Sequence, residues 1–267
     1  MSHELDVVER IAGTVPNPKT GWIFQLLGWL ALLLGAVYVA TQWSTIPDPV
    51  PTHWGPDLQP DDWSAKSVGS VYFPTFMGII VMALCGGLTY LLQVQSVAGL
   101  SKATTEAEVP RALRVMATMR FTLLFVSVIC GAMGVGFAFI QITGPVPALQ
   151  HLTGWSFGLM MALTFASLFG GLGFYVMKNG KVDDEIRAAE RDGIIGTRGS
   201  DQVDDPQGNP DNWKWGMFYH NADDPAIVVE KRFGMGIDFN YAHWQGKVFL
   251  AVAVGILPAV LLLMFVL

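Results

Sequence analysis

The chain has 267 residues, of which 52% are hydrophobic and only 14% are charged, and its mean hydropathy is positive. This composition excludes an ordinary soluble globular domain and makes the lipid bilayer the main solvent and partner of the chain. The formal net charge of −6 and a pI near 5.3 argue against nucleic acid as a partner, because proteins that bind a phosphate backbone normally present a basic surface.

The N-terminal segment, residues 1–21, is polar and carries Glu4, Asp6, Glu9 and Arg10. It passes into a long apolar stretch that has no small-residue cleavage pattern behind it. This order predicts a retained first transmembrane helix and argues against a removed signal peptide.

Five apolar stretches are long enough to cross the hydrocarbon core as helices, which takes about 20 residues. None of them contains a Lys, Arg, Asp or Glu, whereas such residues are dense just outside. The sequence therefore predicts an all-α polytopic membrane protein. The five predicted transmembrane helices occupy residues 22–42, 71–93, 121–142, 154–177 and 248–267.

The orientation follows from the 16 Lys and Arg residues, because cytoplasmic segments retain these residues. All of them except Lys66 fall on the side of the predicted helices that holds the N-terminus. This asymmetry predicts a cytoplasmic N-terminus and an external C-terminus. We expect the plasma membrane as the location.

Between the fourth and fifth predicted helices the sequence changes character twice. A charged, helix-like run is followed by a linker of Gly, Asp, Ser and Gln, and then by β-prone runs separated by a turn signal. The last part predicts two or three short strands. The expected domains are the cytoplasmic N-terminus 1–21, a four-helix membrane domain 22–178 with an outer loop 43–70, a charged helix and flexible linker 179–210, a small β-rich cytoplasmic module 211–247, and a C-terminal transmembrane helix 248–267.

The outer loop contains five prolines, which restrict its backbone to extended and turn conformations. Such a stiff loop can present side chains to a ligand. The candidate ligand-binding residues are His53, Trp54, Asp57, Asp61, Asp62 and Lys66. Imidazole and carboxylate are suitable ligands for a divalent metal, so His53 and Asp57 are the candidates for a metal site. The alternative is that the tryptophans anchor the loop at the lipid headgroups while the aspartates bond turn amides.

The predicted cytoplasmic module carries aromatic, polar and basic residues that suit a docking surface. A Gly-x-Gly beside Lys-Arg does not make a phosphate loop, which needs a longer glycine pattern opening a helix. We expect a turn at residues 221–225, and we expect the basic pair to meet acidic headgroups or a protein partner. The candidate partner-binding residues are Trp213, Tyr219, Asn221, Asp224, Lys231 and Arg232.

Within the predicted helices the absence of ionisable residues argues against a proton-coupled or ion-coupled transporter. Their polar residues are expected to form interhelical hydrogen bonds, and glycine clusters in the second, third and fourth helices predict close packing there. Cys85 and Cys130 are expected to be buried thiols, not a disulfide or a metal site. No catalytic set such as Ser/His/Asp or Cys/His is present at an accessible place, so neither an enzyme nor a cofactor is expected.

Two segments are similar to known families. The stretch 46–66, with Pro47, Pro51, His53, Trp54 and Lys66 and with Pro74 in the next helix, resembles the uncharacterised membrane domain at the start of bacterial Sdp-type immunity proteins. The stretch 213–240 resembles a second uncharacterised module marked by Trp-Lys-x-Gly-x-Phe-Tyr-x-Asn, Asp-Asp-Pro and Lys-Arg-x-Gly-x-Gly followed by Asn. Immunity members protect the producing cell from a membrane-active peptide and sequester a transcriptional repressor. The resemblance implies no catalytic residues.

The leading interpretation is therefore a non-enzymatic membrane protein of the signalling or immunity type. Its outer loop is expected to bind an extracellular peptide, lipid or metal, and its module a cytoplasmic regulator or a partner in a membrane complex. Three alternatives stay open: a transporter or transporter subunit for an uncharged or amphipathic solute, an accessory or assembly subunit of a membrane complex, and a metalloenzyme with His53 at its site.

Overall fold

The structure, a computed structural model, describes residues 2–101, 109–196, 206–207, 209–230 and 237–252. The chain divides into two compact units, Met1–Gly196 and Thr197–Leu267. The first unit is predominantly helical and the second contains short strands. Each unit is described by itself below.

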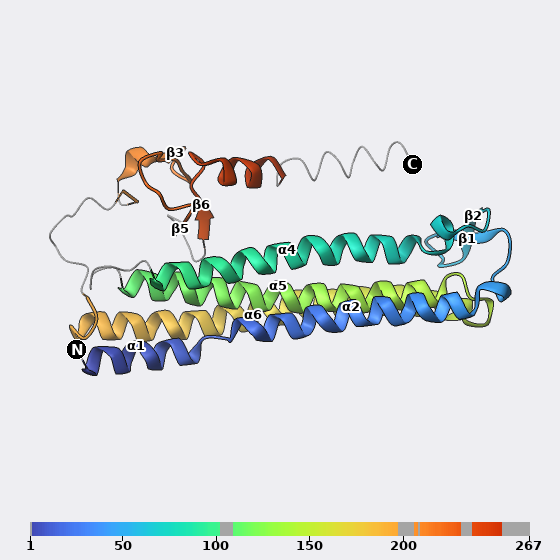
Figure 1. The fold of residues 1–267 in the computed structure, drawn as a ribbon, viewed down its shortest axis with the longest axis horizontal. Coiled ribbons are helices and arrows are strands. Elements are labelled where there is room, and N and C mark those ends of the chain that lie inside the picture. The colour runs from blue at the N-terminus through green and yellow to red at the C-terminus, as the bar shows by residue number, and fades with distance from the viewer. Residues whose placement is uncertain (1, 102–108, 197–205, 208, 231–236, 253–267) are drawn as a thin grey trace. The chain divides into compact units, whose positions relative to one another are not determined.

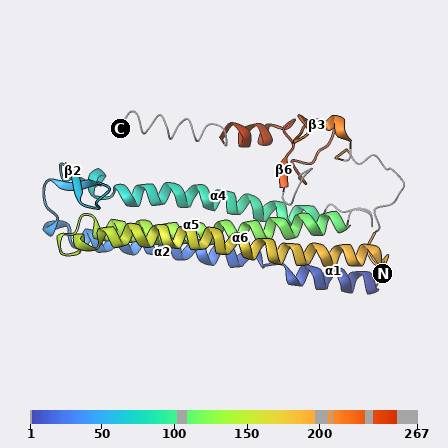
Figure 2. The same ribbon diagram turned by 180° about the vertical axis from the view of Figure 1, so that it is seen from behind.

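Four long helices lie side by side in the first unit (Figures 1 and 2). They are α2 (Pro18–Thr41), α4 (Phe73–Ser101), α5 (Val109–Thr143) and α6 (Thr153–Arg191). Each contains a stretch that is long and apolar enough to cross a membrane. Helix α5 is central because it packs against each of the other three. Four predicted membrane helices are thus confirmed, whereas most of the fifth, 253–267, lies outside the described residues.

Helices α2 and α5 approach each other through glycine. The buried residues of α2 repeat with the spacing of a coiled-coil seam, and a β-carbon added to Gly28 would lie only 3.2 Å from the Cα of Gly131 in α5. The predicted close packing is confirmed for the α5 glycines. The seam of α2 consists of Gly21, Gln25, Gly28, Leu32, Gly35 and Val39. Among the residues that the structure describes, none outside the glycine's own stretch of helix lies within 4 Å of a β-carbon added to Gly86, Gly87, Gly158, Gly170 or Gly173.

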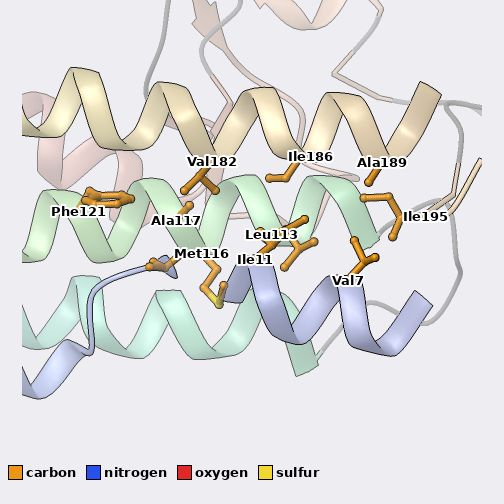
Figure 3. Close-up of a cluster of buried hydrophobic side chains, with 11 residues drawn as sticks. Val7, Ile11, Leu113, Met116, Ala117, Phe121, Val182, Ile186, Ala189 and Ile195 are labelled. Carbon is orange, nitrogen blue, oxygen red and sulfur yellow. The ribbon is translucent and has the colours of Figure 1, made fainter. Parts of the chain in front are cut away.

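A short amphipathic helix, α1 (Ser2–Thr14), packs against the ends of α5 and α6 that lie near the N-terminus. Figure 3 shows Val7 and Ile11 of α1 pointing toward side chains of α5 and α6. The pattern of Val7, Ile11 and Val15, spaced by four residues, is the sequence signal for this contact. The whole cluster comprises Val7, Ile11, Val15, Leu113, Met116, Ala117, Phe121, Val182, Ile186, Ala189 and Ile195.

This cluster explains why α5 and α6 are longer than the apolar stretches. Helix α5 begins at Val109, ahead of the predicted membrane-spanning stretch 121–142 and as expected for a helix that leads into it, and α6 continues to Arg191. Arg114 of α5 holds the two extensions together, because its Nε donates to Asp183 (2.8 Å) and its terminal nitrogens donate to the Glu190 carboxylate. The charged helix expected at the start of the 179–210 segment is thus a continuation of α6.

The expectation of two free thiols is wrong. Cys85 of α4 and Cys130 of α5 form a disulfide, with their Cα atoms 6.3 Å apart. The reason is the close packing of α4 on α5, which brings into bonding range two residues that are 45 positions apart in sequence.

The polypeptide between α2 and α4 forms the short helix η1 (Trp43–Thr45), the antiparallel strands β1 (Val50–Trp54) and β2 (Pro60–Ser64), and helix α3 (Val68–Val71). The single-turn helix η3 (Pro147–Leu152) joins α5 to α6 at the same end of the bundle. In Figure 1 the two strands lie at the end opposite the N-terminus.

The second unit contains η4 (Pro210–Asn212) and two antiparallel strand pairs within its described residues. Strand β3 (Trp213–Lys214) pairs with β4 (Phe218–Tyr219), and β5 (Val228–Glu230) pairs with β6 (Ile237–Phe239). A helix then covers residues 244–252. The prediction of a small strand-containing region before the C-terminal apolar stretch is confirmed.

Candidate functional site

The 50–64 hairpin, formed by β1, β2 and the turn between them, contains most of the predicted ligand-binding residues. Val50 pairs with Ser64 and Trp54 with Pro60, with irregular register between them. The turn closes through a backbone hydrogen bond from Gly55 to Gln59 (2.9 Å), and the Asp57 carboxylate accepts the Gln59 amide (3.0 Å). Pro51 lies in β1 and Pro60 begins β2, and both strands are edges of a two-stranded sheet, where proline is tolerated.

The hairpin is fixed onto the helical bundle by two apolar side chains. The Trp54 ring lies 6.0 Å from the Phe157 ring of α6, and a β-carbon on Gly144 would come within 3.1 Å of it. Leu58, at a φ of 60°, reaches over Gly154, where an added β-carbon would lie 3.0 Å from its methyl carbon. Trp54, a predicted ligand-binding residue, thus serves to seat the loop, while Leu58 was not predicted at all.

The Lys66 side chain also stabilises the loop, through hydrogen bonds to its backbone. Its ammonium group donates to the backbone oxygens of Trp43 (2.6 Å) and Ile46 (2.8 Å) and lies 5.1 Å from the centre of the Trp43 ring. Its backbone amide donates to Asp48 (2.9 Å). The predicted role of Lys66 in ligand binding is replaced by this internal one, because the amine points toward the carbonyls of the preceding turn.

We expect Lys66→Met to lower the free energy of unfolding of the hairpin by about 2 kcal/mol, because two hydrogen bonds from a charged donor are lost while the apolar stem is kept. The measurement is the rate of chymotrypsin cleavage in the 50–64 hairpin of the detergent-solubilised protein. Lys181→Met is the matched control, because Lys181 is exposed on α6. Equal cleavage rates in the two variants would contradict the anchoring role.

The other side chains that the hairpin exposes to solvent include acidic and aromatic ones. His53 Nδ1 lies 2.5 Å from Asp61 Oδ1, and these two side chains are 67% and 51% exposed. Asp62 accepts its neighbour's amide and Trp63 is half exposed. The structure therefore pairs His53 with Asp61 and leaves Asp61 and Asp62 exposed, and the role of these residues in ligand binding stays a prediction.

A metal site at this place is not formed by the side chains alone. Asp57, the second metal candidate, is engaged in the turn, and the direct partner of His53 is Asp61. In the part of the chain that the structure describes, no group of three or more His, Cys, Asp or Glu residues is close enough to hold a metal ion.

The predicted partner-binding residues of the second unit are mainly its core. Trp213 and Tyr219 are buried against Val229, and the Trp213 ring lies 5.1 Å from the Tyr219 ring. The Tyr219 hydroxyl donates to Asp224 (2.7 Å), which is itself buried. These three side chains therefore build the fold instead of its surface. Lys231 and Arg232 lie outside the described residues, and their role stays a prediction.

Asn240 is the central polar residue of this unit and is completely buried. Its amide nitrogen donates to the backbone oxygens of Asn221 (2.7 Å) and Asp224 (3.1 Å), and its oxygen accepts the amides of Asn221 and Ala242 (both 3.1 Å). Burial and a hydrogen bond to Asp238 raise the pKa of the nearby Tyr241 hydroxyl above its usual range. The polar residues around Asn240 thus form a network that stabilises the fold of the module.

Polar residues inside the bundle bond one another, as predicted. Gln25 of α2 donates to Thr89 of α4 (3.2 Å), and Thr89 lies 3.3 Å from the hydroxyl of Ser127 in α5. Near the other end, Gln141 of α5 accepts the Thr75 amide (3.1 Å) and donates to the Val71 carbonyl (3.0 Å), beside Pro74. These contacts connect three helices, although Gln25 Oε1 and Thr75 Oγ1 are buried without a hydrogen-bond partner among the described residues.

Two family models match the chain. Residues 30–78, which include the end of α2, the hairpin and the start of α4, match a domain of unknown function (DUF1648). Residues 222–247, the second half of the module, match a family of unknown function (DUF5808). No curated protein and no solved structure matches the chain. The two matches agree with the two segments whose similarity was expected, and they carry no activity with them.

Proposed function

We propose that the chain is a non-enzymatic multi-pass protein of a bacterial plasma membrane, of the signalling or immunity type, whose 50–64 hairpin recognises an extracellular ligand. In this proposal the N-terminus is cytoplasmic, a fifth span follows the module, and the hairpin faces outward. The distribution of Lys and Arg supports this orientation. A Gram-positive host and an immunity role rest on the resemblance of the 46–66 segment to immunity proteins.

The observation that carries the proposal is an acidic face on a fixed hairpin. Asp57, Asp61 and Asp62 are exposed, whereas the amine of Lys66, the only Lys or Arg between the first two spans, points into backbone carbonyls. The hairpin therefore offers carboxylates and the Trp63 ring to solvent beside the His53 imidazole and without a balancing Lys or Arg. Charge complementarity favours a cationic ligand that also has apolar groups, which are the properties of a cationic membrane-active peptide.

The test is the binding of a fluorescent cationic amphipathic peptide to the protein in nanodiscs made of zwitterionic lipid. We expect the double variant Asp61→Asn, Asp62→Asn to weaken binding about fivefold to tenfold, because exposed charge pairs contribute up to about 1 kcal/mol each. Added salt should weaken binding to the wild type more than binding to the variant.

The control is the double variant Asp211→Asn, Asp223→Asn, which makes the same change of charge at two exposed positions in the second unit. The proposal predicts that this variant binds the peptide as the wild type does. Equal affinities of all three proteins for the peptide would exclude the acidic face as the recognition surface. In a susceptible bacterial host, expression of the wild type should raise the inhibitory concentration of the same peptide, and expression of the double variant should not.

A further inference from the structure

The tip of the β3–β4 hairpin presents large apolar side chains to solvent. Trp215 is 89% exposed and Met217 is 57% exposed. Trp215 and Gly216 have φ angles of 52° and 74°, and the Met217 amide donates to the Lys214 carbonyl (3.2 Å) across the turn. Such turns favour Asn, Asp or Gly, because a bulky side chain is strained at positive φ. Apart from one edge-on contact with Phe218, the Trp215 ring lies in solvent, which points to a role outside the module.

A third exposed apolar side chain, that of Trp244, lies where the chain turns from the module into a helix. It is 70% exposed and begins the helix over residues 244–252. The tip is connected to this place by aromatic contacts, because Phe218 packs edge-on against both Trp215 (5.9 Å) and Tyr241 (5.4 Å). The Tyr241 amide also donates to the Tyr219 carbonyl (2.9 Å). The exposed tip and the start of the helix are thus parts of one rigidly connected surface.

The sequence after Trp244 indicates that a lipid bilayer covers this surface. From Val248 to the last residue the chain contains no charged residue, and Val248, Phe249 and Val252 are exposed on the described part of the helix. Tryptophan prefers the headgroup level of a bilayer, where its ring is buried and its N–H stays hydrated. Lys214 and Lys247 are exposed beside Trp215 and Trp244, where lysine meets anionic headgroups.

We propose that Trp215, Met217 and Trp244 form an interfacial anchor that seats the module on the headgroup region of an anionic lipid bilayer. This inference rests on the proposed fifth span, because that span brings residue 244 to the membrane surface. The anchor fixes the module against the bilayer at two places, the strained hairpin tip and the entry point of the helix. The predicted basic residues Lys231 and Arg232 are not needed for it.

The experiment uses the full chain in vesicles of phosphatidylcholine and phosphatidylglycerol (3:1), with an environment-sensitive fluorescent amino acid in place of Met217. Ala222, exposed in the same unit, is the control position, and Val252 reports insertion of the helix. Lipids carrying a nitroxide near the headgroup are expected to quench the label at 217 at least twofold more than the label at 222. Because the vesicles contain no other protein, such quenching identifies lipid and not a protein partner.

The variant Trp215→Gly tests whether the exposed ring anchors the module while leaving the fold of the module intact. Glycine suits the positive φ, so the melting temperature of the module should stay the same or rise, while quenching at 217 should fall at least twofold. Unchanged quenching in this variant, or no preferential quenching at 217 in the parent protein, overturns the anchor. A label at 252 that is quenched while the label at 217 is not would retain the fifth span and reject the anchor. A label at 252 that is not quenched would reject the span itself.

Discussion

Replacing Gly131 with alanine is expected to lower the stability of the helical bundle by about 2 kcal/mol. A β-carbon at this position would lie 2.5 Å from the backbone oxygen of Phe24 in α2, so one helix must move away from the other. Forcing an extra methyl group into a packed interface costs about 1–3 kcal/mol, and this exceeds the gain of up to about 1 kcal/mol from the better helix propensity of alanine. The measurement is the free energy of unfolding in mixed detergent and dodecyl sulfate micelles.

The matched control is Gly173→Ala in α6. This glycine is exposed, and nothing lies within 4 Å of a β-carbon placed on it. We therefore expect Gly173→Ala to leave the stability unchanged or to raise it by up to about 1 kcal/mol. If the two alanine variants unfolded with the same free energy, direct backbone contact between α2 and α5 would not be what holds the bundle together.

Replacing Asn240 with alanine is expected to unfold the C-terminal module. The substitution removes four hydrogen bonds and leaves the carbonyls of Asn221 and Asp224 without this donor in a buried place. Net loss of about 1 kcal/mol per bond, with a further penalty for each buried group left unsatisfied, amounts to at least about 4 kcal/mol. A unit this small has little stability in reserve, because it buries little apolar surface.

The readout is limited proteolysis of the full chain in nanodiscs, followed by identification of the cleaved segment. Asn240→Ala should make residues 209–230 accessible to protease at least tenfold faster, whereas the bundle, a separate compact unit, should keep its melting temperature. Asp223→Ala is the control, because Asp223 is exposed and lies between Asn221 and Asp224, the two residues whose carbonyls Asn240 bonds. Wild-type resistance in Asn240→Ala would contradict the central role of this side chain.

The difference between predicted and observed helix ends has a simple physical origin. Hydropathy marks where a helix leaves the hydrocarbon, but backbone hydrogen bonding continues as long as the side chains find partners. Beyond the apolar stretches, α5 and α6 continue because Leu113 and Ile186 pack with Ile11 of α1, and because Arg114 bonds two carboxylates. The spacing of Val7, Ile11 and Val15 indicates that this helix buries one face. The sequence alone does not show which side chains of α5 and α6 that face contacts.

The candidate site was predicted in its composition but not in its arrangement. The sequence placed His53, Asp61 and Asp62 in one loop, and the structure pairs His53 with Asp61 on a hairpin that leaves both aspartates exposed. The sequence did not reveal that Trp54 and Lys66 turn inward. Their partners, Phe157 and the backbone oxygens of Trp43 and Ile46, lie in other segments. The same holds for the module, where the motif residues Trp213, Tyr219 and Asp224 proved to be core.

By itself the sequence determined that this chain belongs in a membrane, where its first four apolar helices lie, and that a small strand-containing region precedes the last apolar stretch. These are local properties, since the length and hydrophobicity of a stretch set its free energy of transfer whatever its neighbours are. Only the tertiary structure decided which side chains face inward, that Cys85 meets Cys130, and that the tryptophans divide into buried Trp213 and exposed Trp215. Those outcomes depend on contacts between distant segments, and a contact contributes no stabilisation until both of its residues are in place.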